Sequence, residues 1–174
     1  MKNVLSILVF FVSFSAFGQG QFQKESAATL SHAADQVMQL AAAIPADKYA
    51  WTPQSGVRSV SEVCAHMISA NYFFASKLGA KIPDGVKMES LEKDLKTKDA
   101  VTAELKRSFD VALEAIKNTN DAALPNKVEL PFPGEFTKMT SILIILVHSN
   151  EHLGQLIAYA RMNKITPPWS KGQD

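Results

Sequence analysis

The sequence contains a single cysteine, Cys64, among its 174 residues. A lone cysteine cannot close a disulfide within the chain, so even an oxidising compartment would add no covalent cross-link to this fold. Stability must therefore come from packing, with a bound metal ion as a further source. Cys64 belongs to an apolar stripe at helical spacing, and we interpret it as a small buried hydrophobic residue, neither a nucleophile nor a ligand.

The chain also lacks an excess of charge of either sign. It carries 18 basic and 17 acidic residues, which leaves a formal net charge of +1. Proteins that bind nucleic acids or anionic membrane surfaces concentrate positive charge on one face or segment. We therefore expect no nucleic-acid partner. Internal repeats and low-complexity tracts are missing as well, and the length is that of one domain.

No apolar run reaches the ~20 residues that a helix needs to cross a bilayer. The longest lies at the N-terminus, where apolar residues 4–12 follow the charge of Lys2 and precede small residues that end at Gly18. This layout is typical of a secretory signal peptide, and a retained membrane anchor is the alternative. We expect residues 1–18 to be cleaved, the protein to be periplasmic or extracellular without a stable membrane anchor, and residues 19–174 to form one domain.

Apolar residues recur at helical spacing in four segments, and strand periodicity is missing. The long connection 80–98 contains a proline, a glycine and many charges, with one short helical turn, and could cross a whole helical bundle. Residues 128–133 are expected to be extended. These patterns predict an all-α fold, a four-helix bundle. The predicted helices cover residues 24–44, 59–78, 99–117 and 137–163.

Two local patterns within these helices make sharper predictions. Ser59 and Glu62 form a capping box, in which each side chain satisfies a backbone N–H of the first turn, so a helix should begin there. Residues 142–147 are apolar in all directions around the last helix. We expect this segment to be buried on every side, either centrally in the bundle or partly against another subunit.

Histidines supply the candidate chemistry. His148 and His152 are four residues apart, so both imidazoles lie on one face of the last helix and can hold one ion. They follow the apolar segment, which places them toward the interior. Glu151 precedes the second histidine and points about 100° away from it around the helix, unlike the glutamate of the HExxH motif. A metalloprotease mechanism of that type is therefore not expected.

A third ligand is needed, and two other histidines are present. His32 lies on the polar side of the first helix and is interpreted as a surface residue. His66 lies at the edge of the apolar stripe of the second helix and could face the bundle centre. The alternative to a metal site is a set of core histidines that bond to backbone carbonyls and share a polar pocket.

Several motifs resemble the DinB superfamily of metal-binding four-helix bundles. They are WTP at 51–53, GVRSV at 56–60, SEVCAHM at 61–67, HSNEHLGQL at 148–156 and RMNKITPP at 161–168. The resemblance implies metal ligands at His66, His148 and His152, an up-down-down-up topology with the long crossover between the second and third helices, and a homodimer packed through helical faces. Many members carry arginine after the last ligand, where this chain has Leu153.

Three neutral imidazoles leave a coordination position for water, as in open catalytic zinc sites. We expect one divalent transition-metal ion, zinc or nickel, with Glu62, Glu151 and Gln155 as residues that orient the ligands. The leading hypothesis is a metal-dependent hydrolase of a small amide or ester, with water on the three-histidine site as nucleophile. One alternative is a thiol-dependent S-transferase or isomerase, which export argues against. Another is a non-enzymatic metal- or ligand-binding bundle, because no general base is evident. The sequence names no substrate.

Overall fold

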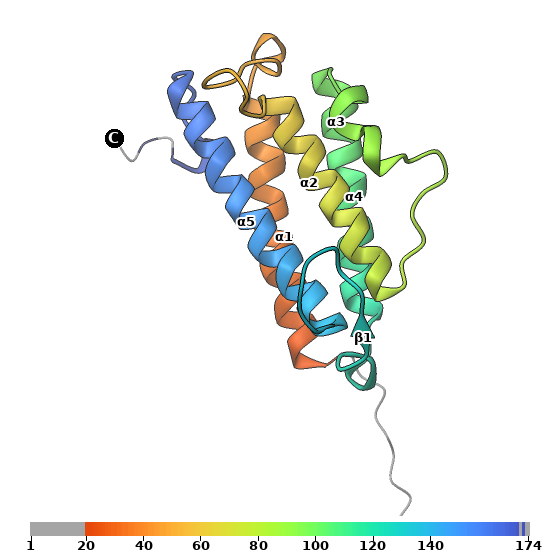
Figure 1. Cartoon of the computed structure of the whole chain (residues 1–174). Helices are drawn as coiled ribbons and strands as arrows, with labels where there is room; N and C mark the ends of the chain where they lie inside the picture. The colour runs from red at the N-terminus through yellow and green to blue at the C-terminus, as the bar shows by residue number, and fades with distance from the viewer. Residues whose placement is uncertain (1–19, 171, 173–174) are drawn as a thin grey trace, which may run out of the picture.

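The computed structural model describes residues 20–170 and residue 172, and these form a mostly helical structure (Figure 1). The predicted signal peptide, residues 1–18, lies outside the described residues. The described residues contain five α-helices: α1 Gln21–Ala43, α2 Val60–Leu78, α3 Leu91–Asp94, α4 Lys98–Asn118 and α5 Lys138–Met162. The four long ones agree with the predicted helices to within a few residues at each end. No helix of the described part combines the length and hydropathy needed to cross a membrane.

The four long helices bury their apolar stripes against one another. α2 packs against α4 and α5, and α1 packs against the same two helices. Each buried leucine or isoleucine contributes roughly 1.5–3 kcal/mol relative to an exposed one, so this shared core is the main source of stability. The large side chains that are fully buried include Leu30, Leu40, Met67, Ile68, Leu105, Ile116, Ile142, Ile145 and Leu156.

α2 begins and ends where its local chemistry predicts. The Ser59 hydroxyl accepts from the Glu62 N–H, and the Glu62 carboxylate accepts from the Ser59 N–H at 2.9 Å, which confirms the capping box. Gly79 ends the helix in a left-handed conformation with φ 106°, which glycine adopts without steric cost. These two ends define the position of every side chain on α2, including His66.

The connection between α2 and α4 runs along the length of the molecule and contains α3 (Figure 1). Its buried anchor is Leu91, which belongs to the core cluster. The predicted short helical turn in this connection is confirmed as α3. Since α3 packs against α2, the return segment brings charged residues next to the second helix.

Only the first residue of the segment 128–133, which was predicted to be extended, lies in a strand. β1 Lys127–Val128 pairs with β2 Phe136–Thr137 in an antiparallel ladder that places Lys127 opposite Thr137. The remaining residues of the segment form the loop between these strands. This small hairpin leads directly into α5, whose first turn Thr137 caps.

The prediction that residues 142–147 are buried on every side is wrong within one chain. Leu143 is 46% exposed and Val147 is 67% exposed, whereas Ile142 and Ile145 are buried. The reason is that α5 packs against α1 and α2, and within the described part of the chain no other helix covers its outer face. Met139, 39% exposed, continues the same outer face. The segment is apolar all round, so its sequence did not indicate which face would lie against α1 and α2.

The capping box makes a prediction about stability. Ser59→Ala removes the hydroxyl that accepts from the first turn of α2 and should lower the free energy of unfolding by about 1 kcal/mol. Urea unfolding followed by circular dichroism measures this change. Ser31→Ala is the control, because Ser31 is exposed within α1, where alanine should be neutral or slightly stabilising. An equal loss in both variants would contradict the capping role.

Candidate metal centre

Three histidines from two helices converge at the contact between α2 and α5. His66 lies on α2, and His148 and His152 lie on α5, one turn apart. Nε2 of His148 is 3.1 Å from Nε2 of His66 and also 3.1 Å from Nε2 of His152. One nitrogen from each ring lies within 4.8 Å of the other two, an arrangement that could hold a metal ion.

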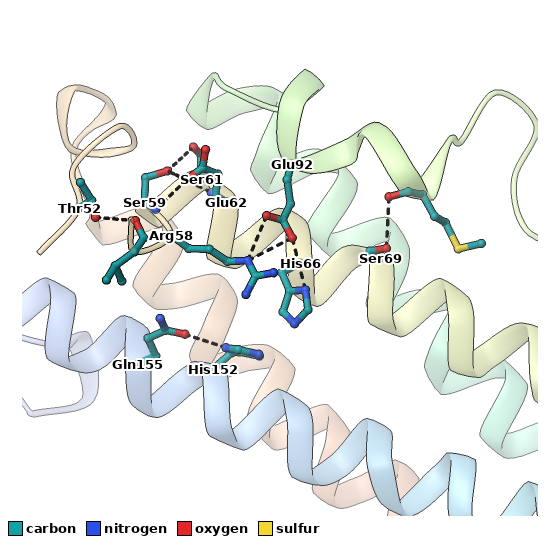
Figure 2. Close-up of polar contacts among 12 residues, drawn as sticks. Thr52, Arg58, Ser59, Ser61, Glu62, His66, Ser69, Glu92, His152 and Gln155 are labelled. Atoms are coloured by element: carbon teal, nitrogen blue, oxygen red, sulfur yellow. Dashed lines mark hydrogen bonds and ion pairs between the residues drawn. The ribbon is translucent and has the colours of Figure 1, made fainter. Parts of the chain in front are cut away.

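The outer nitrogens of two of these rings face hydrogen-bond acceptors. Figure 2 shows Glu92 of α3 above His66, with Oε1 3.4 Å from Nδ1 of the ring. It also shows Gln155 beside His152, where the amide Oε1 lies 2.8 Å from Nδ1. A carboxylate and an amide oxygen can only accept, so the Nδ1 atom of each neutral ring carries the proton. The Nε2 atoms of His66 and His152 are then left with lone pairs.

The orientation of the Gln155 amide follows from its own partners. Its Nε2 donates to the hydroxyl of Tyr159 at 2.9 Å, and that hydroxyl donates to the backbone carbonyl of Arg58 at 3.1 Å. Because the hydroxyl proton is committed to a carbonyl, the hydroxyl must accept from the amide, and Oε1 must face His152. Trp51 packs edge-on against Tyr159 with ring centroids 5.3 Å apart, and this contact restricts the position of the Tyr159 ring.

The geometry fits a small divalent ion. Nitrogens bound at about 2.0–2.1 Å to a tetrahedral zinc ion lie about 3.3–3.4 Å apart, close to the 3.1 Å separations of His148 from its two neighbours. Without an ion, one proton on Nε2 of His148 could satisfy only one of the two facing lone pairs. A cation could accept a lone pair from each of the three nitrogens at once, so the arrangement suits metal binding better than it suits hydrogen bonds among the three rings.

Burial favours the neutral rings that a metal requires. Burial is the largest cause that lowers the pKa of His148, to about 4, and the neighbouring His152, His66 and Arg58 lower it further. Burial also lowers the pKa of His66, with contributions from Arg58 and His152, and Glu92 partly opposes them. Burial therefore favours the uncharged forms of His66 and His148, and this reduces the competition between protons and a metal.

The remaining candidates occupy different surroundings. His32 is exposed on α1, as predicted for a surface residue. Glu62 serves the Ser59 cap and accepts from Lys96 at 3.2 Å, so its carboxylate is engaged there and not beside a ligand. The capping bond from Ser59 is the main cause that lowers its pKa. Glu151 is exposed. Cys64 is fully buried, and burial raises the pKa of its thiol to about 12, which suits a hydrophobic role.

Sequence reasoning missed Glu92 and Arg58. Arg58 Nε lies 3.1 and 3.0 Å from the two oxygens of Glu92. The carboxylate that contacts His66 is therefore paired with a guanidinium. The signal available was the predicted helical turn in the 80–98 connection, which contains Glu92. That signal could not show which residue of α2 the turn would meet, because their contact depends on how α3 packs.

Comparison with known proteins places this geometry in a family. The model of the DinB superfamily matches residues 29–156, which include all three histidines. No curated protein matches the chain. A solved DinB-like protein from Bacillus cereus ATCC 10987 is similar in fold, with a TM-score of 0.71 at 14% identity over 83% of this chain and 95% of that one. A conserved protein from Enterococcus faecalis has a TM-score of 0.65 at 15% identity over 80% and 95%.

At 14% and 15% identity to this chain, the two solved structures show a similar fold and nothing more. The match itself spans most of the chain and contains all of α2 and the part of α5 that bears His148 and His152. The protein therefore belongs to the DinB superfamily.

Proposed function

We propose that this protein is an exported metal-dependent hydrolase of a small amide or ester that holds one zinc or nickel ion on His66, His148 and His152. The observation that carries the proposal is the convergence of their three Nε2 atoms, two pairs of which are 3.1 Å apart. Membership of the DinB superfamily supports the metal. Export rests on the signal-peptide pattern of residues 1–18.

Each residue of the site has a defined task in this proposal. The three histidines hold the ion as neutral ligands, and Glu92 and Gln155 keep the Nδ1 protons outward so that Nε2 stays available. His152 is buried, whereas the side chain of His66 is 30% exposed, so solvent and a small substrate reach the site past His66. A bound divalent ion lowers the pKa of coordinated water and polarises a carbonyl group.

Two alternatives use the same site. In a thiol-dependent transferase or isomerase, the thiol must come from a cosubstrate, because Cys64 is fully buried with a raised pKa. A non-enzymatic metal- or ligand-binding bundle is favoured by one observation: Glu92, the carboxylate nearest His66, is paired with Arg58 and is poorly suited to act as a general base. Assays of chromogenic esters and amides, with and without added thiol, separate the three.

The scaffold that we propose is a four-helix bundle with up-down-down-up topology. Its support is that α1 and α2 each contact both α4 and α5, and that the connection bearing α3 returns along the molecule before α4 begins (Figure 1). This arrangement sets α2 and α5 side by side with their histidines facing.

A metal assay tests the proposal directly. Purified untagged protein should contain about one transition-metal ion per chain, and alanine at any one of the three histidines should reduce this to a small fraction, since two ligands hold an ion poorly. His32→Ala is the matched control and should retain the metal. Gln155→Ala should keep the ligands but weaken metal affinity roughly 10- to 100-fold. Unchanged metal content in all three ligand variants would contradict the proposal.

The metal-free protein should lose stability in mild acid. The pKa of His148 is about 4 in the folded protein and 6.5 ordinarily, so between these values the unfolded chain binds more protons. The free energy of unfolding should therefore fall as pH drops from about 6.5 to 4. Thermal unfolding of chelator-treated protein at several pH values measures this slope. His148→Ala should flatten it and His32→Ala should not; an equal slope in both would overturn the explanation.

A homodimer through the outer face of α5 is proposed as well. Met139, Leu143 and Val147 expose a stripe of apolar surface at i, i+4, i+8 spacing, which a second copy could cover. Leu143→Glu should then shift the protein from dimer to monomer in analytical ultracentrifugation without loss of helix content. Ala158→Glu, further along the same helix and also exposed, tests how far the contact extends. A wild-type protein that sediments as a monomer at high concentration would refute the dimer.

A further inference from the structure

Arg58 stands at the entrance of the three-histidine site with part of its guanidinium uncommitted. Its Nε contacts both oxygens of Glu92, and Oε1 of Glu92 also contacts Nδ1 of His66. One carboxylate therefore links the guanidinium to the His66 ring. Figure 2 shows the guanidinium beside this ring, above His152 and Gln155 of α5. Both hydrogen bonds to Glu92 come from Nε, and within residues 20–170 the structure gives the Nη1 and Nη2 atoms no hydrogen bond.

The backbone of Arg58 is held at the same place. Its carbonyl accepts from Tyr159 of α5, the residue that also orients Gln155. Arg58 is therefore attached to two helices, through its carbonyl to α5 and through Glu92 to α3. The side chain is 45% exposed, so the free Nη atoms are accessible from solvent. A guanidinium positioned in this way presents a ready-made donor pair to a planar anion.

The charges at the site favour such an anion. Imidazoles that bind a metal through Nε2 would add no charge of their own, and Glu92, the carboxylate beside them, is already compensated by Arg58. The other nearby carboxylate on α2, Glu62, is engaged by Ser59 and Lys96. A divalent ion on these histidines would thus carry two charges that no ligand offsets, and an anionic ligand would relieve this imbalance.

We propose that the ligand of this site carries a carboxylate, and that Arg58 recognises it with the Nη atoms that Glu92 leaves free. The inference rests on the proposed metal site and adds the chemical class of its ligand. Arg58 is then a specificity-determining residue, and Glu92 is a positioning residue that holds both the guanidinium and the His66 ring.

Binding of acetate to the cobalt-loaded protein tests the proposal without any assay of activity. Cobalt(II) suits imidazole ligands, and its visible spectrum changes when a ligand enters its coordination sphere. Acetate is titrated at constant ionic strength and compared with acetamide, a neutral molecule of the same shape. Wild type should bind acetate in preference to acetamide, and Arg58→Gln should bind acetate about tenfold more weakly.

Arg107→Gln provides the matched control. Arg107 is 50% exposed and forms an ion pair with Glu104 on α4. Its substitution therefore removes an arginine–glutamate ion pair that is not part of the histidine site. This variant should bind acetate like wild type. Arg58→Lys keeps the charge but cannot make two parallel bonds, and its affinity should fall between those of wild type and Arg58→Gln. Circular dichroism checks that every variant is folded.

The outcomes are distinguishable. Cobalt uptake with equal acetate affinity in wild type and Arg58→Gln would overturn the role of Arg58 and leave the metal site intact. Equal affinity for acetate and acetamide would overturn the carboxylate. Failure of the wild-type protein to take up cobalt at all would overturn the proposed function and, with it, this inference.

Discussion

The packing of α2 against α5 is the contact on which the site depends. His66 and His148 are 82 positions apart in sequence, yet their Nε2 atoms are 3.1 Å apart because these two helices share one stretch of core. A shift of one residue in either helix would turn a ring by about 100° and remove it from the cluster. The caps at Ser59 and Thr137, which define where α2 and α5 begin, therefore matter for the site as well as for stability.

Two paths of hydrogen bonds and ion pairs lead outward from the histidines, and both end at Arg58. One path runs from His66 through Glu92 to the Arg58 side chain, and the other runs from His152 through Gln155 and Tyr159 to the Arg58 carbonyl. Both paths orient an imidazole so that Nε2 faces the cluster. The connection between α2 and α4, which looks like a simple return segment, contributes to the site because α3 supplies Glu92.

Local signals predicted the parts of this structure that depend on near neighbours in sequence. The Ser59 capping box, the end of the second helix at residue 78 and the helical spacing of the core residues are all properties of short segments, and each is found in the structure. The prediction for residues 142–147 was wrong for a related reason. Composition showed that the segment is apolar all round, but whether Leu143 and Val147 are covered depends on which elements lie beside α5.

Periodicity in the sequence was enough to predict the helices, to put His148 and His152 on one face, and to favour His66 over His32 because His66 lies beside an apolar stripe. The contact of Glu92 with His66, and the position of Arg58 between both paths, became visible in the folded structure alone. The physical reason is that helix periodicity follows from backbone geometry within a few residues, whereas a contact between α3 and α2 depends on the packing of the whole core.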